Sequence, residues 1–529
     1  MSAVDRFEII LALMSVIIVL ELVARRLHLP QAAAFVLGGM ALALIPAAPN
    51  ISLDPDLALV LFLPPLLLSG AFLTAWRDFR AELRIILQLA VGAVLFTTAV
   101  VGVVAHLVVP SLPWAACFAL GAIVSPPDAV AAKAVLHGLK LPDRIVVLLE
   151  GESLVNDASG LVLYRFAVAA ALTGTFNAGE ATLSFGVLSL GGVAAGIVCG
   201  AIATLLLARM QDPLLSIIGS FLAAWGSYIG ADALGVSGVL STVTCGLIMG
   251  WRQHEILGAS TRTQAGAVWA VVVFVLESLV FVLVGLSLRG VLDRVTVGGH
   301  NPAELLPPIA GVTGAVILSR FAWIVPTTYL VRMLLPRVRR RDPYPPLAVP
   351  IVMSWAGMRG VVSLAAALAL PDRFPGRDLI LAVTFAVILV TVLVQGTTLA
   401  PMIRALRLER FPGGRRTTMG EHEARARVAQ IQLAAVEQAS LDEQGTQRHP
   451  RLIEQYGYRA RASARYSEAA TDLADSRREH FGVILAATKA GRRELLRLHR
   501  TGEIHDSVLQ TLEHELDLEE LTARKFLQD

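Results

Sequence analysis

Apolar residues occur in runs of about 20 along most of the chain, and short polar connections separate one run from the next. The runs continue to about residue 405, after which charged residues dominate. A run of this length is enough for a helix to cross the hydrocarbon core of a bilayer. The pattern predicts an all-α polytopic membrane protein. Thirteen spans are expected, at residues 7–24, 30–47, 55–73, 84–109, 113–137, 143–172, 183–208, 213–231, 235–250, 265–288, 305–332, 346–370 and 378–404.

The positive residues of the connections orient these spans, because cytoplasmic loops retain an excess of Lys and Arg. One alternate set of connections holds Arg25, Arg26, Arg77, Arg80, Arg84, Lys140, Arg144, Arg209, Arg252, Arg262, Arg332, Arg337, Arg339, Arg340 and Arg341. The other set holds only Arg289, Arg294, Arg373 and Arg377. We therefore expect a multi-pass protein of the cell (inner) membrane with its N-terminus outside and its C-terminal tail in the cytoplasm. The first run lacks a small-residue cleavage site, which favours a retained span over a signal peptide.

Composition supports this class and excludes others. The chain of 529 residues is 55% hydrophobic and only 16% charged, too apolar for an ordinary soluble protein of this size. A net charge of +3 is too small to indicate a nucleic-acid partner. Cys117, Cys199 and Cys245 fall within apolar runs and suggest neither a disulfide framework nor a metal cluster. We find no zinc motif, nucleophile elbow or phosphate-binding glycine loop, and expect no enzymatic activity and no cofactor.

A cluster of Pro412, Gly413 and Gly414 separates two parts of the chain. Residues 1–405 form the predicted membrane domain, and residues 406–529 form a charged helical tail. Within the tail, apolar spacing predicts helices over 477–500 and 503–527, joined as a hairpin. Its mixed charge indicates a solvated or self-associating module, with regulation left open.

The sixth predicted span contains the stretch GESLVNDASGLVLYRF, residues 151–166. An ionised carboxylate at the centre of a span costs on the order of 3 kcal/mol on insertion scales, so Asp157 requires a wet cavity or a partner. At helical spacing Ser153 shares its face, while Glu152 and Asn156 lie one turn apart beside it. These residues predict an ion or proton site near the membrane midplane. The alternative is that Asp157 forms only a buried ion pair between helices.

The fifth span is interrupted in its middle by Pro126 and Pro127, which remove two amide donors and oppose helical geometry before each ring. We expect the helix to break there. Freed carbonyls at this depth make cation ligands, and Asp128 would sit at the N-terminus of the following half-helix. A simple proline kink with Asp128 as a buried cap is the alternative.

The twelfth span carries Arg359 between Gly357 and Gly360. Glycines permit an irregular turn, and a guanidinium in mid-membrane requires a carboxylate or carbonyl partner, for which Glu152 and Asp128 are candidates. The fifth and twelfth spans occupy corresponding positions in the two halves of the chain. Interrupted spans so placed indicate an inverted-repeat transporter with its site between them.

Two further charged residues lie within predicted spans. Glu277 is the lone carboxylate of the tenth span, and it could line the cavity or contact Arg320. Arg320, about a third of the way through the eleventh span, could pair with Glu277 or face a wet funnel.

Four motifs, in order, resemble those of the sodium/proton exchangers of the first monovalent cation:proton antiporter family. They are LPPLLLSGAF in the third span, SPPDAVAA in the fifth, GESLVNDASGLVLYRF in the sixth and SWAGMRGVVSLAAALALP in the twelfth. The resemblance covers residues 7–405, and the ending LHRTGEIHDSVLQTLEHELDLEE resembles the tail of bacterial members more loosely. It implies a homodimer in the lipid bilayer, each subunit having a dimerisation part and a six-helix core with two crossed, broken helices.

The resemblance also implies roles for the site residues. Asp157 would carry the cation and the proton in alternation, so that Na⁺ binds at Asp157 and Ser153, with no cofactor. The backbone from Ser125 to Pro127 would add ligands, and Asn156 would mark the Asn-Asp subtype, which is associated with electroneutral exchange.

Three other positions follow from the same resemblance. Asp128 would stabilise the crossing or reach the ion through water, and Glu152 with Arg359 would form a structural ion pair. This chain departs from many relatives at Ser69, where they carry an acid in the third span. That departure leaves the choice of ion open.

The expected function is exchange of Na⁺ or Li⁺ for H⁺ across the membrane, electroneutral, in pH and sodium homeostasis. One alternative is a K⁺/H⁺ antiporter, and another is a membrane sensor that works through its tail. An intramembrane aspartyl hydrolase using Asp128 and Asp157 is disfavoured, because the chain has no GxGD segment with a partner YD motif.

Overall fold

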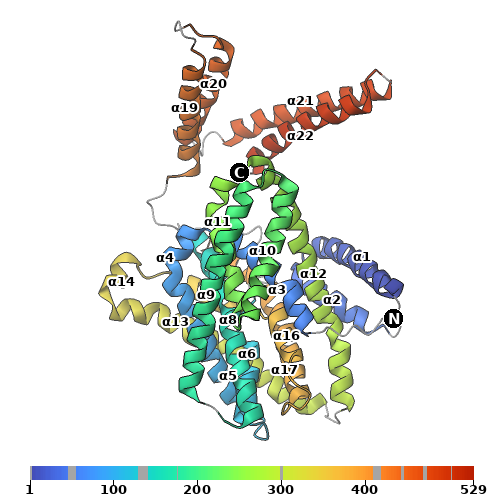
Figure 1. Cartoon of the computed structure of the whole chain (residues 1–529), viewed down its shortest axis with the longest axis vertical. Helices are drawn as coiled ribbons and strands as arrows, with labels where there is room; N and C mark the ends of the chain where they lie inside the picture. Colours follow the sequence, from blue (N-terminus) through green and yellow to red (C-terminus); the bar gives the residue numbers. More distant parts are fainter. Residues whose placement is uncertain are drawn as a thin grey trace. The chain divides into compact units, whose positions relative to one another are not determined.

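The computed structural model divides the chain into two compact units, Met1–Gly414 and Arg415–Asp529 (Figure 1). It describes residues 3–45, 55–128, 141–175, 177–297, 302–408, 419–441, 446–468, 474–501 and 503–528. The first unit extends past residue 405 because Leu408 is still fully buried in the same apolar cluster as Ile403.

Where the chain is described, helices occupy the predicted spans of the first unit, and this unit contains no strand among those residues. The first half contains α1 (Ala3–Leu27), α2 (Gln31–Ala43), α3 (Pro55–Leu73), α4 (Trp76–Leu87) continued through the π-helical η1 (Gln88–Ala93) into α5 (Val94–Val108), α6 (Trp114–Val124) and α8 (Asp143–Thr173). The second half contains α9 (Ala178–Arg209), α10 (Pro213–Ala233), α11 (Gly238–Ile256), α12 (Ala259–Val297), α13 (Pro302–Leu334), α14 (Pro336–Arg341), α15 (Ala348–Trp355), α16 (Val361–Leu368) and α17 (Arg377–Val390), which continues through the π-helical η2 (Thr391–Gln395) into α18 (Gly396–Ala405). Within the described residues, seven helical stretches are long and apolar enough to cross a membrane, and α2, α3 and α6 contribute shorter apolar helices.

Capping residues in the connections set several helix ends. The side chain of Asp212 accepts hydrogen bonds from the first free amides of α10, and Ser237 does the same for α11. Helix α8 is terminated by Gly174, the residue after Thr173, whose φ of 72° places it in the left-handed region that ends helices. The polar connections therefore fix these helix ends.

A stripe of glycines brings α9 against α11. Gly192, Gly196 and Gly200 follow one another at four-residue spacing, and a side chain at any of them would press on the backbone of α11. In a membrane, where helix association depends on close packing, small residues at this spacing let two backbones approach. Gly39 and Gly285 play the same part between α2 and α12.

The two interrupted spans lie against α8 in the interior of the membrane unit (Figure 1). Helix α6 contacts α8 and α16, and both α15 and α16 contact α8. This arrangement brings the fifth, sixth and twelfth spans to one place, although they are far apart in the sequence.

The second unit contains α19 (Glu421–Ala439), α20 (Pro450–Glu468), α21 (Ala474–Arg500) and α22 (Asp506–Gln528). Helices α21 and α22 pack together, with the rings of Phe481 and Phe526 stacked at 4.6 Å. Arg492 of α21 donates hydrogen bonds to Asp517 at 2.7 Å and to Glu520 at 2.9 Å. The predicted hairpin is therefore present.

Candidate functional site

Both predicted helix breaks are present. Helix α6 ends at Val124, and Ser125 to Asp128 follow outside any helix. The remainder of the fifth span, residues 129–137, lies outside the described residues. In the twelfth span, residues 356–360 separate α15 from α16. Two prolines in one span and two glycines in the other therefore interrupt the helices where the sequence places them.

The two breaks cross and bond to each other. The backbone amide of Asp128 donates to the carbonyl of Met358 at 2.7 Å. In the other direction, the Arg359 side chain donates from Nε to the Val124 carbonyl at 2.7 Å and from a terminal nitrogen to the Ser125 carbonyl at 3.2 Å. The guanidinium also bonds to the carbonyl of Gly357 and is fully buried. Carbonyl oxygens at the end of α6 therefore satisfy a buried cation.

An opposite charge lies at the start of α16. A Cβ at Gly360 would overlap the carboxylate of Asp128, so this carboxylate rests directly on the backbone that begins α16. Helix N-termini carry a partial positive charge and helix C-termini a partial negative one. The acid at the start of α16 and the arginine at the end of α6 thus match the electrostatics of the two half-helices.

Helix α8 meets the fifth-span break through Asn156. The side-chain amide of Asn156 donates to the Pro127 carbonyl at 2.7 Å, and its own oxygen Oδ1 is buried without a hydrogen-bond partner among the described residues. Asp157 is next in sequence and only 8% exposed. One turn further along, Gly160 leaves space for the Pro126 ring, which a Cβ would overlap. An unpartnered amide oxygen and a buried carboxylate therefore lie next to the break.

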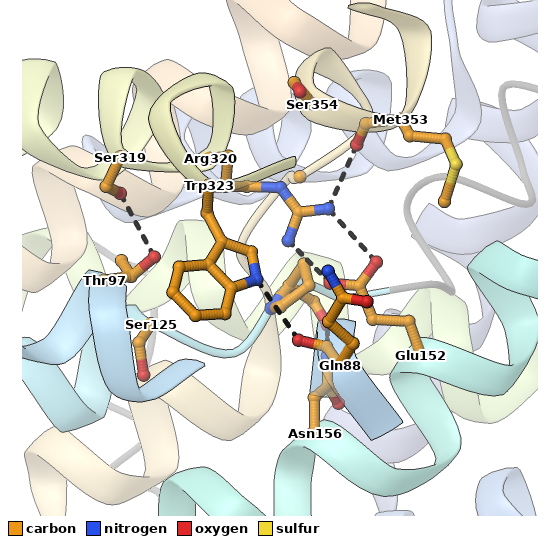
Figure 2. A network of polar contacts seen from close by, with 12 residues as sticks. Gln88, Thr97, Ser125, Glu152, Asn156, Ser319, Arg320, Trp323, Met353 and Ser354 are labelled. Carbon is orange, nitrogen blue, oxygen red and sulfur yellow. Dashed lines mark hydrogen bonds and ion pairs between the residues drawn. The ribbon is translucent and has the colours of Figure 1, made fainter. Parts of the chain in front are cut away.

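The expected ion pair between Glu152 and Arg359 is wrong. Glu152 pairs with Arg320 of α13, which donates to both carboxylate oxygens at 2.6 and 3.1 Å and also to the Met353 carbonyl at 3.0 Å (Figure 2). Both side chains are 2% exposed. The physical reason is that the carbonyls at the break already surround Arg359, whereas Arg320 reaches α8 from the side.

The same pairing corrects the expectation for Arg320. It contacts Glu152, not Glu277, and it is buried instead of facing a wet funnel. Glu277 is partly buried on α12, and Ser69 is partly buried on α3.

A small cavity joins several of the predicted residues, but Asp157 and Asn156 are not among those that line it. Its lining consists of Pro127, Asp128, Leu149, Glu152, Ser153, Arg320 and Ala356. The fifth-span break, α8 and α13 thus face a common space that offers carboxylate, hydroxyl and carbonyl oxygens. Oxygen ligands suit hard monovalent cations, and the described residues contain no group of three His, Cys, Asp or Glu side chains placed to hold a metal ion.

Sequence reasoning missed the hydroxyl contacts that hold this region. Thr98 donates to the Ser125 hydroxyl at 3.1 Å. Ser319 donates to the Thr97 hydroxyl at 3.1 Å, as Figure 2 shows. Trp323 donates to the Gln88 carbonyl in η1 at 3.2 Å. The available signal was the presence of Ser and Thr inside apolar runs, which says nothing about their partners.

A second charged cluster lies at the N-terminal end of α8. Arg144 donates to both carboxylate oxygens of Asp342 at 2.8 and 2.9 Å, and to Glu82 at 3.0 Å. Arg332 bonds to Asp342 at 2.5 Å. Desolvation by burial opposes ionisation of Asp342, but its bonds to the two arginines outweigh that effect and hold the pKa of the carboxyl below its usual range. The cluster ties α8 to α4, α13 and the connection before α15.

Comparisons with known proteins agree with this architecture. Residues 9–405 match the family model described as sodium/hydrogen exchanger, transmembrane. An uncharacterised Na⁺/H⁺ exchanger of Mycobacterium tuberculosis is 33% identical over 97% of this chain and 95% of its own. A sodium, potassium, lithium and rubidium/H⁺ antiporter of Bacillus subtilis is 32% identical over 75% of this chain and 61% of its own. The solved structure of a sodium proton antiporter from Methanocaldococcus jannaschii is similar with a TM-score of 0.59 at 19% identity, covering 77% of this chain and all of that one.

Proposed function

Because the chain belongs to the family of transmembrane sodium/hydrogen exchangers, we propose that Asp157 carries Na⁺ and H⁺ in alternation across the membrane. Na⁺/H⁺ antiport is the activity that family membership supports. The observation that carries the residue assignment is the position of Asp157. It is a buried carboxylate beside an unpartnered amide oxygen, where α8 bonds to the break in the fifth span.

The charges around the crossing support a one-for-one exchange. Among the described residues at the crossing, Glu152 and Arg320 neutralise each other, and the other charged groups are the carboxylates of Asp128 and Asp157 and the guanidinium of Arg359. With these three groups ionised, their charges sum to −1. One monovalent cation or one proton cancels this charge. The unloaded site stays charged, and moving it through an apolar barrier is costly.

Competition between the two ions for Asp157 then produces exchange. Either ion neutralises the site and allows the switch between inward-facing and outward-facing forms. Because each loaded state carries the same net charge, the cycle moves no net charge and is electroneutral. The Ser153 hydroxyl, the Pro127 carbonyl and the Asn156 amide oxygen are the proposed additional ligands of Na⁺, with Asp128 acting on the backbone at the start of α16. No cofactor is required.

The setting of this activity is also part of the proposal. We place the protein in the cell (inner) membrane as a homodimer, with the N-terminus outside and the charged tail in the cytoplasm, and assign it to pH and sodium homeostasis. The arginine-rich connections support the orientation. Nothing in the proposed cycle requires catalysis of a covalent reaction.

Potassium is the second candidate substrate. The Bacillus subtilis relative is named for sodium, potassium, lithium and rubidium, and Ser69 stands in the third span where the family resemblance leads us to expect an acid. A site with one acid fewer has a weaker ligand field, which favours the smaller Na⁺ over K⁺ less strongly, so potassium must be tested beside sodium.

The test uses the full chain in liposomes with an internal acid gradient, a pH-sensitive dye and added chloride salts of sodium, lithium, potassium or choline. We expect sodium and lithium to dissipate the gradient at a rate that an imposed potassium–valinomycin voltage does not change. Asp157→Asn should abolish this flux while the protein still purifies as a folded species. Sodium-dependent proton flux in that variant would refute the assignment. If no cation moves protons in the wild type, the tail-based sensor becomes the function to test.

A further inference from the structure

Arg359 is anchored at two places, only one of which is its side chain. Its guanidinium bonds to the carbonyls of Val124 and Ser125 in the fifth span. The backbone amide of Arg359 lies in the break between α15 and α16. This amide donates a hydrogen bond to the hydroxyl of Thr391 at 3.1 Å. A backbone amide buried without an acceptor destabilises a structure, so this bond fixes the course of the break.

Thr391 is built to accept that bond. It is fully buried, begins the π-helical segment η2, and donates its own hydroxyl hydrogen to the Ile388 carbonyl at 3.1 Å. Because the hydrogen is engaged there, a lone pair of the oxygen is directed toward the Arg359 amide. Single π-helical turns within α-helices occur frequently at functional sites.

The fifth-span break is supported in a parallel way. Thr98, in the span that contains η1, donates to the hydroxyl of Ser125 at 3.1 Å. Each break is therefore held by a threonine hydroxyl from a neighbouring span, and each of those spans contains a π-helical segment.

We propose that Thr391 is a positioning residue for cation exchange, which holds the Arg359 backbone so that the guanidinium stays on the fifth-span carbonyls beside the cation site. The chain of contacts is short. Thr391 holds Arg359, Arg359 holds the carbonyl of Ser125, and Asn156 holds the carbonyl of Pro127 two residues later. A shift of Arg359 moves the carbonyls proposed as ligands and the positive charge that opposes Asp128 and Asp157. This inference rests on the proposed function of Asp157.

The experiment compares Thr391→Val with Thr391→Ser, and uses Thr384→Val as the matched control. Valine keeps the volume and removes the hydroxyl, whereas serine keeps the hydroxyl. Thr384 lies two turns earlier in α17, is equally buried, and has a hydroxyl without a hydrogen-bond partner among the described residues. Its replacement therefore removes the same atom and no contact.

The readouts are the sodium concentration for half-maximal exchange and the maximal rate, both in liposomes. We expect Thr391→Val to raise the half-maximal sodium concentration about three- to tenfold, the effect of losing one buried hydrogen bond. Thr391→Ser should stay close to the wild type, and so should Thr384→Val. If Thr391→Val does not fold, Thr391→Ala replaces it in the same comparison with serine.

Three results would overturn the proposal: an unchanged half-maximal sodium concentration in Thr391→Val, a fall in protein yield or maximal rate alone, or failure of serine to restore the wild-type value. The wild type and Asp157→Asn are measured in the same preparation. Flux through Asp157→Asn would refute the assigned carrier, and the Thr391 comparison would still report whether this hydroxyl sets sodium affinity.

Discussion

Removal of Arg320 is predicted to leave a buried charge without its partner. Glu152 and Arg320 are 2% exposed and joined by two hydrogen bonds of 2.6 and 3.1 Å, and a third bond links Arg320 to the Met353 carbonyl. Breaking such a buried pair by removing one member costs about 3–5 kcal/mol, because the remaining ion stays desolvated. Arg320→Met and Glu152→Gln should each lower the free energy of unfolding by roughly this amount.

The double variant separates the interaction energy of the Glu152–Arg320 pair from the contributions of the residues around it. Replacing both members removes both charges, so Glu152→Gln with Arg320→Met should be far more stable than the sum of the single effects indicates. The coupling energy should reach about 2–3 kcal/mol, the upper part of the range for contacting residues. The assay is unfolding of the purified protein in mixed micelles, followed by tryptophan fluorescence.

A second cycle with Arg359→Met serves as the control, because it represents the pairing that the sequence suggested. Arg359 bonds to carbonyls and not to Glu152, so its coupling with Glu152→Gln should be clearly smaller than that in the Arg320 cycle. A coupling below about 0.5 kcal/mol in the Arg320 cycle would refute the reasoning. Coupling concentrated in the Arg359 cycle would restore the original pairing.

Three further predictions follow from single contacts. Gly160→Ala places a methyl group on the Pro126 ring and should destabilise the protein by about 1–3 kcal/mol with loss of exchange. Gly186→Ala should be tolerated, because Gly186 has open space around it. Equal melting temperatures for the two variants would contradict this prediction. Asp342→Asn should lower the melting temperature at neutral pH, and the difference from wild type should vanish in acid. The pKa of Asp342 is depressed in the folded state, so its stabilisation is complete above the unfolded value of about 3.9 and is lost as pH falls through the folded value; a difference that persists at low pH would argue against the mechanism. Asn156→Asp should abolish exchange, because the amide that donates to the Pro127 carbonyl is replaced by a carboxylate that this carbonyl repels. Sodium-dependent proton flux at the wild-type rate in this variant would exclude a role for the Asn156 amide in exchange.

Much of the site was predictable because it depends on local backbone chemistry. Pro126 and Pro127 break a helix in any context, since their rings remove amide donors. The cost of an ionised acid in a span singled out Asp157 without any knowledge of its neighbours. The partner of Glu152 was not predictable, because Arg320 is 168 residues away and several buried charges competed for the same role.

The sequence by itself determined the spans, their breaks and the charged residues that are too costly to expose to lipid. These properties follow from hydrophobicity, from the missing amides of proline and from the cost of burying charge, each of which acts within a few residues. Only the tertiary structure decided that Arg320 neutralises Glu152, that Arg359 bonds to backbone carbonyls, and that Thr391 holds the twelfth-span break. Such pairings depend on which helices pack together and on the depth in the membrane at which each side chain lies. The spacing of residues along one helix does not determine the depth of a residue on another helix.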